Sequence, residues 1–124
     1  MPTHPQHVAV WFEIPVSDLA KAMAFYNAVL DQDMRIDDSG PNPVAMFNAE
    51  SFEHGVAGHL YPGEPSDSGI TIHLAAPDSL SQTRARIADA GGKIESDDIP
   101  LPFGSFFYAR DLDGNSIGIF EAKS

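Results

Sequence analysis

Residues 8–30 have the sequence VAVWFEIPVSDLAKAMAFYNAVL, in which a strand pattern is followed by a polar break and a helix pattern. Successive side chains of a strand point to opposite faces, so every second residue belongs to one set. The set expected in the core consists of Val8, Val10, Phe12, Ile14 and Val16. The set on the opposite face consists of Ala9, Trp11, Glu13 and Pro15. The alternation therefore predicts a strand with one buried face.

The polar break supplies a cap for the helix that follows. Ser17 or Asp18 can accept a hydrogen bond from the first helical turn. Apolar residues then recur at helical spacing, at Leu19, Met23, Tyr26 and Leu30, and should pack onto the sheet. The spacing predicts a helix that ends near Asp31.

Residues 69–91, GITIHLAAPDSLSQTRARIADAG, repeat the same design about 60 residues later. The apolar face of the second strand consists of Ile70, Ile72, Leu74 and Ala76, with Thr71, His73 and Ala75 opposite. The buried stripe of the second helix consists of Leu80, Thr83, Ile87 and Ala90, and Gly91-Gly92 can end it through a left-handed C-cap. Two such halves folded against each other enclose a cleft suited to a small molecule.

The remaining segments complete two similar modules in one domain, residues 1–124. Module one is expected at about residues 7–62, with further strands at 34–37, 44–49 and 56–61. Breaker-rich residues 62–69 form a linker, and module two spans about residues 69–122, with strands at 93–95, 105–110 and 116–121. The pattern predicts an α+β fold.

Composition excludes several classes of function. The net charge of −11, with only seven Lys and Arg residues, argues against binding nucleic acid and favours cationic ligands. The chain has no cysteine, so it offers neither disulfides nor thiolate metal ligands. No apolar run is long enough to span a bilayer, and the first residues lack the pattern of a secretion signal. We expect a soluble, acidic, cytoplasmic protein.

Three segments in this order resemble the vicinal oxygen chelate superfamily, also called the glyoxalase/bleomycin-resistance/dioxygenase fold. They are VSDL at 16–19 leading to AFY at 24–26, AGGK at 90–93, and RDLDGNSI at 110–117. The resemblance covers nearly all of the chain. It implies two βαβββ modules, a curved eight-stranded mixed sheet assembly around a cavity, and a homodimer.

The resemblance also implies where a divalent metal ion would bind. Metalloenzymes of the family place a His seven residues before the Asp of the capping motif and a Glu after the Ile that follows the Asp-Gly-Asn turn. Here Trp11 and Gly118 occupy those places, and neither can donate a lone pair to a metal ion. The other two positions correspond to Ala57 or His59, and to Thr71, Ile72 or His73. We expect no cofactor, while a rebuilt divalent site using Glu13, His59 and His73 stays open.

Glu13 and His73 are the candidate catalytic residues. Glu13 lies in a hydrophobic strand on the expected cleft side, and the internal repeat aligns it with His73. Together they could form an acid/base pair. Alternatively, Glu13 pairs with a cation such as Arg110 or Lys93, and His73 bonds to a strand neighbour or Tyr108.

The candidate ligand-binding residues are mostly aromatic. Trp11 offers a broad plane for stacking on an aromatic or cationic ligand. The full set is Trp11, His59, Phe106, Tyr108, Gly118 and Phe120; core packing is the alternative role for the aromatic members. The leading hypothesis is a protein that binds a small molecule in the cavity between the modules. Nucleic acid and membranes are not expected as partners. The alternatives are a lyase or isomerase that uses Glu13 and His73, with or without a metal ion and His59, and a structural or regulatory partner of another protein.

Overall fold

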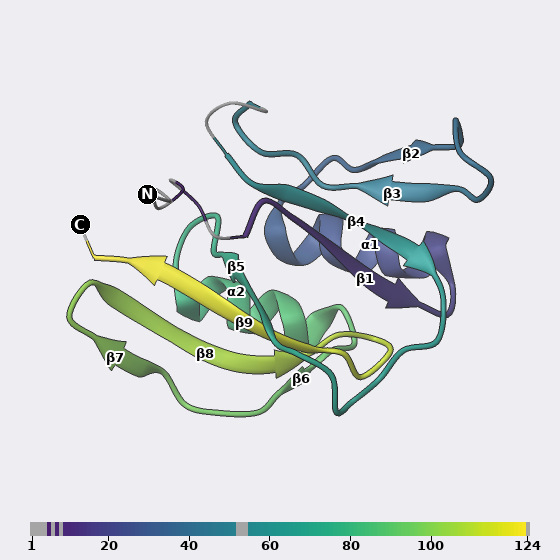
Figure 1. Cartoon of the computed structure of the whole chain (residues 1–124). Coiled ribbons are helices and arrows are strands. Elements are labelled where there is room, and N and C mark those ends of the chain that lie inside the picture. Colours follow the sequence, from purple (N-terminus) through teal and green to yellow (C-terminus); the bar gives the residue numbers. More distant parts are fainter. Residues whose placement is uncertain (1–4, 6, 8, 52–54, 124) are drawn as a thin grey trace.

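A computed structural model of the chain describes residues 5, 7, 9–51 and 55–123 (Figure 1). Val8, expected in the core, lies outside the described residues. The first module contains β1 (Trp11–Val16), α1 (Leu19–Leu30), β2 (Arg35–Asp37), β3 (Val44–Met46) and β4 (Ala57–Pro62). The second contains β5 (Ile72–Ala75), α2 (Leu80–Asp89), β6 (Lys93–Ile94), β7 (Ile99–Leu101), β8 (Gly104–Arg110) and β9 (Ser116–Ala122). The α+β class and the two-module plan are confirmed.

The strands form two sheets in which the strands of each module pair in a similar order. The first sheet has the order β1-β4-β3-β2, and the second has the order β5-β9-β8-β6 with β7 also paired to β8. In each module the opening strand pairs in parallel with the closing strand, β1 with β4 and β5 with β9. Both opening strands therefore lie at a sheet edge, and Figure 1 shows these two edges facing each other.

The described residues form nine strands, one more than the expected eight. The additional strand, β7, forms a hairpin with β8 in which Leu101 pairs with Gly104. The sequence pattern does not indicate β7, because the strand is short and contains Pro100. Proline cannot donate a hydrogen bond to a ladder and is confined mainly to edge strands.

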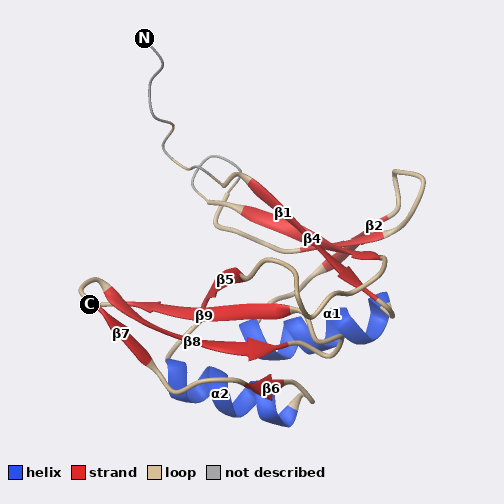
Figure 2. Ribbon diagram, turned by 60° about the horizontal axis from the view of Figure 1, so that its bottom comes forward, coloured by secondary structure: helices blue, strands red, loops and turns tan. Residues whose placement is uncertain are grey.

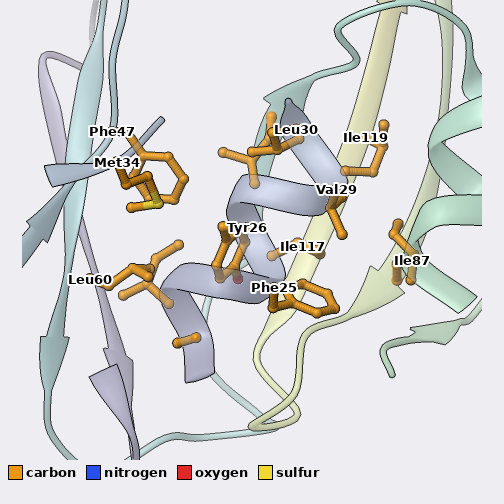
Figure 3. Packing of buried hydrophobic residues seen from close by; sticks show 14 of the residues in the cluster. Phe25, Tyr26, Val29, Leu30, Met34, Phe47, Leu60, Ile87, Ile117 and Ile119 are labelled. Atoms are coloured by element: carbon orange, nitrogen blue, oxygen red, sulfur yellow. The ribbon is translucent and has the colours of Figure 1, made fainter. Parts of the chain in front are cut away.

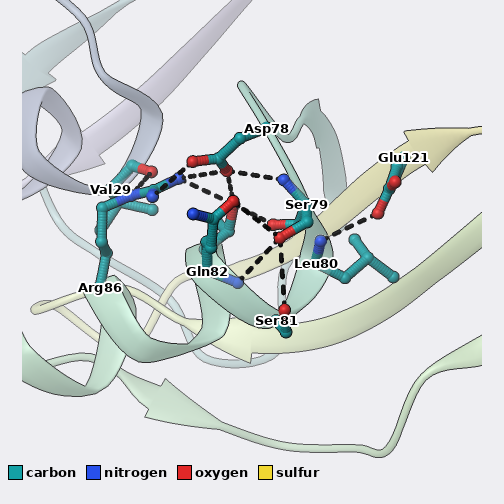
Figure 4. Close-up of polar contacts among 9 residues, drawn as sticks. Val29, Asp78, Ser79, Leu80, Ser81, Gln82, Arg86 and Glu121 are labelled. Atoms are coloured by element: carbon teal, nitrogen blue, oxygen red, sulfur yellow. Dashed lines mark hydrogen bonds and ion pairs between the residues drawn. The ribbon is translucent and has the colours of Figure 1, made fainter.

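Both helices begin and end as the sequence predicts. Asp18, rather than Ser17, caps α1 by accepting a hydrogen bond from the Lys21 amide. Ser79 caps α2 through the Gln82 amide (Figure 4). Gly91 follows α2 with a φ of 97°, the left-handed conformation expected after a helix.

The core is continuous between the modules. Figure 3 shows α1 between the two sheets, with Leu60 of β4 on one side of Tyr26 and Ile117 of β9 on the other. Figure 2 shows α1 and α2 beside each other, and the Arg86 Nε of α2 donates to the Val29 carbonyl of α1. This packing leaves the opposite faces of the two sheets available to line grooves.

Two residues expected in the core are exposed. Val10 is 70% exposed and Ile70 is 83% exposed, because the paired strands begin only at Trp11 and Ile72. The alternating pattern thus extends beyond the ladders. In the described part of the chain, no helix has the length and apolar composition needed to cross a membrane.

Candidate functional site

A groove runs between the facing edge strands β1 and β5. Its volume is about 710 Å³, and its walls include Trp11 and Glu13 from one module and His73 from the other. Phe12 and Ile72 contribute apolar surface to it. The two opening strands of the internal repeat therefore supply a shared hollow that is wide enough for a small molecule.

Trp11, Glu13 and His59 form a chain of hydrogen bonds beside this groove, and Trp11 and Glu13 line it. The Trp11 Nε1 lies 3.1 Å from His59 Nδ1, and His59 Nε2 lies 3.0 Å from Glu13 Oε1. The strand register explains the contact, because Glu13 and His59 are direct partners in the parallel β1–β4 ladder. Trp11 lies two residues away on the same face of β1.

The indole determines which nitrogen of His59 carries the proton. An indole N–H only donates, so His59 Nδ1 must accept and is unprotonated. The neutral imidazole then carries its hydrogen on Nε2, which donates to the Glu13 carboxylate. Both nitrogens of His59 are thus engaged, and neither has a lone pair free while the Trp11 bond persists.

His73 lies in an aromatic group on the other wall. Its ring centroid is 5.1 Å from that of Phe106 and 5.9 Å from that of Tyr108, in edge-on arrangements. Gly118 is its ladder partner, and a β-carbon there would come within 2.3 Å of His73 Nδ1. The absence of a side chain at Gly118 therefore makes room for the His73 ring.

The structure divides the predicted site residues into two groups. Trp11, Glu13 and His59 are joined by hydrogen bonds, and His73, Phe106, Tyr108 and Gly118 are in contact on the second sheet. Phe120 is the ladder partner of Phe106 in this second group, and its ring also packs against Phe103, with ring centroids 6.1 Å apart. Glu13 and His73 border the same groove. Within the described residues no hydrogen bond or ion pair links them.

The alternative prediction that Glu13 pairs with Arg110 or Lys93 is wrong. Arg110 donates to Glu95 at 2.9 Å, and Lys93 Nζ lies 4.0 Å from the same carboxylate. The partner of Glu13 is His59. No pattern near Glu13 predicts this hydrogen bond, because it depends on the register between β1 and β4, in which Glu13 and His59, 46 residues apart, are direct partners.

A second groove, of about 460 Å³, shares Trp11 and Glu13 with the first, is also lined by His59, and extends over the first sheet toward Asp37. Asp37 accepts hydrogen bonds from the hydroxyl and the amide of Ser39, and these bonds lower the pKa of its carboxyl. Glu13 therefore lies where two grooves meet.

The residues at the family's metal positions do not fit a divalent ion. Trp11 and Gly118 offer no lone pair, Trp11 pairs in the ladder with Ala57, and the His73 ring covers Gly118. His59 could bind a metal ion only after losing its bond from Trp11. Over the described ranges, no group of three or more His, Asp and Glu side chains is placed to hold one.

Several solved structures share this fold. A glyoxalase/bleomycin resistance protein from Albidiferax ferrireducens has a TM-score of 0.72 at 19% identity, covering 94% of this chain and 100% of that one. TnmS3, an antibiotic binding protein from Streptomyces, has a TM-score of 0.64 at 24% identity, covering 97% and 100%. A lactoylglutathione lyase from Agrobacterium tumefaciens has a TM-score of 0.64 at 19% identity, covering 94% and 95%. Identities this low show the fold alone.

The family assignment comes from the sequence itself. A comparison with curated proteins gave no match. The model of the Glyoxalase/Bleomycin resistance protein/Dioxygenase superfamily matches residues 5–119, nearly the whole chain. The chain belongs to this superfamily.

Proposed function

We propose that this protein binds a small molecule in the groove between β1 and β5, and that it does so without a divalent metal ion. The observation that carries the proposal is that Trp11, Glu13 and His73, from the opening strands of both modules, border one groove of about 710 Å³. Ligand sites are typically hollows with apolar walls and a few convergent polar groups.

The chemistry of the walls favours an aromatic or cationic ligand. Trp11 is 38% exposed, so part of its ring is available for stacking or for a cation–π contact. The Glu13 side chain is 63% exposed and can attract positive charge. No lysine or arginine is among the described residues that line the two grooves. The antibiotic binding protein with the same fold supports a binding role.

Trp11 is the only tryptophan, so its fluorescence tests the proposal directly. We expect planar aromatic cations such as proflavine to change the Trp11 emission saturably, and planar aromatic anions of similar size to bind weakly. Glu13→Gln should weaken the binding of the cation. Glu64→Gln, which removes an exposed carboxylate outside the groove, is the matched control. A panel of aromatic ligands that leaves the Trp11 emission unchanged would overturn the proposal.

A second candidate function is acid/base catalysis, as a lyase or isomerase using Glu13 and His73 with or without His59. The hydrogen bond between His59 and Glu13 favours it, because an imidazole that bonds a carboxylate is a common proton-transfer arrangement. Elemental analysis of protein purified without chelators tests the metal-dependent form of this second function. Stoichiometric metal would favour the metalloenzyme, whereas no uptake after repletion would leave binding or metal-free catalysis.

The proposal includes a homodimer. Ile70 lines the groove between β1 and β5, and Val10 lines a further hollow of about 260 Å³ beside Trp11. Both are exposed apolar side chains that contact with a second copy would cover. Light scattering across a dilution series tests this, and a monomer at all concentrations would contradict it. The cytoplasmic location stays a prediction, which cell fractionation would test.

A further inference from the structure

We infer that the positively charged group of the ligand carries N–H donors, and that Glu13 recognises them while His59 and Trp11 act as positioning residues for its carboxylate. The inference deepens the proposed function and rests on it. It concerns which class of cation the groove selects.

The direction of the hydrogen bonds carries the first step. Trp11 can only donate, so it imposes the acceptor role on His59 Nδ1 and the donor role on Nε2. A protonated His59 would place two donors against each other at 3.1 Å. The arrangement therefore holds a neutral imidazole whose single N–H points at Glu13 Oε1.

The hydrogen bond from His59 orients the Glu13 carboxylate but occupies only one of its two oxygens. His59 takes one oxygen, Oε1, and no further hydrogen bond to the Glu13 side chain is formed by the described residues. The His59 side chain is 16% exposed, whereas that of Glu13 is 63% exposed. Oε2 thus keeps its acceptor capacity and is available to a ligand in either groove.

A half-satisfied carboxylate discriminates between cations of equal charge. An ammonium, amidinium or guanidinium group can donate a charge-assisted hydrogen bond to Oε2. A quaternary ammonium group has no N–H and keeps its charge behind methyl groups, so it gains only the cation–π contact with Trp11. The site should therefore prefer N–H cations over quaternary ones.

The test uses two probes with the same ring and charge, naphthylmethylammonium and naphthylmethyltrimethylammonium, in isothermal titration at neutral pH. We expect the wild-type protein to bind the primary ammonium about tenfold more tightly. Glu13→Gln should abolish this preference. His59→Leu should lose most of it, since nothing then orients the carboxylate.

His59→Gln distinguishes positioning from a merely structural role. Its amide oxygen can accept from Trp11 and its amide N–H can donate to Glu13, so the direction of the chain is kept. We expect it to restore the preference that His59→Leu loses. Glu13→Gln serves as the variant least exposed to a folding defect, because its side chain faces solvent.

The outcomes separate the inference from the proposal beneath it. Equal affinity of both probes for the wild-type protein would overturn the inference and leave the binding groove standing. Binding of neither probe, with no change in Trp11 emission, would count against both. A preference that persists in Glu13→Gln would also overturn the inference, since the N–H groups would then be read elsewhere.

Discussion

Tyr26 of α1 donates its phenolic hydrogen to Asp111 Oδ2 across 2.6 Å, which joins the first module to the turn between β8 and β9. Both residues are buried. Asp111 also accepts from the amides of Asp113 and Asn115, and the Asn115 side chain donates to the Pro15 carbonyl at 2.8 Å. This polar network fixes the end of β1 against β9 and so sets the relative position of the modules that form the groove.

Replacing Tyr26 by Phe should destabilise the protein by about 2 kcal/mol, because it removes a hydrogen bond to a buried carboxylate. Urea unfolding followed by circular dichroism measures the change. Tyr108→Phe is the matched control, since Tyr108 is 38% exposed and should lose little. Equal stability of Tyr26→Phe and the wild type would contradict a role for this bond.

Alkaline pH should weaken the wild-type protein more than Tyr26→Phe. Burial, followed by the charge of Asp111 and the bond to it, raises the pKa of Tyr26 well above its ordinary value. The unfolded chain ionises this tyrosine near pH ~10, where the folded protein does not. The stabilisation is therefore complete below about pH 10 and declines above it.

Unfolding free energies compared from about pH 8 to pH 11 test this, because the difference between the two proteins should narrow as the pH rises. A constant difference would mean that Tyr26 titrates alike in the folded and unfolded states. Tyr108→Phe again provides the reference.

Much of the fold follows from local patterns. Asp18 and Gly91 carry the signals of helix ends, and the alternation over residues 11–16 correctly separates Ile14 and Val16 from Trp11 and Glu13. Local patterns do not predict the features that depend on which strands pair with one another. Ile70 fits the alternation yet lies before the first ladder partner, so it is exposed, and β7 exists only because β8 pairs with it.

The candidate site shows the same division. The repeat places Trp11, Glu13 and His73 on opening strands, which the structure aligns along one groove. Sequence reasoning groups Glu13 with His59 only as possible metal ligands and misses their hydrogen bond, because the β1–β4 register that makes them partners is not encoded near Glu13. Side-chain roles here are set by residues distant in sequence.

Acid should weaken the contact between α2 and the preceding turn. Arg86 donates two hydrogen bonds of 2.9 Å to the carboxylate of Asp78 (Figure 4), and these lower the pKa of Asp78 to about 2. A lowered pKa stabilises the fold above the unfolded value of about 4, and the stabilisation is lost as the pH falls toward 2. Asp78→Asn should thus be less stable at neutral pH, with the deficit shrinking in acid.

Chemical denaturation over that acid range measures the deficit. Asp97→Asn is the control, because Asp97 is an exposed carboxylate for which no ion pair is seen in the described structure. A deficit of Asp78→Asn that stays constant down to pH ~2 would show that the Asp78 charge contributes nothing to stability.

Gly118→Ala should displace the His73 ring and leave the fold nearly unchanged. The added methyl group would come within 2.3 Å of His73 Nδ1, and Gly118 does not have the positive φ that would strain an alanine. Because His73 is exposed, its ring can rotate outward and abandon its contacts with Phe106 and Tyr108. We expect a loss of stability below about 1 kcal/mol, together with shifted imidazole signals of His73 in NMR spectra.

A double-mutant cycle of Gly118→Ala, His73→Ala and the double variant provides the control. The alanine at position 118 should cost no stability once the His73 ring is gone. A loss of several kcal/mol with unchanged His73 signals would instead place the strain in the β9 backbone, and Gly118 would then serve the sheet rather than the groove.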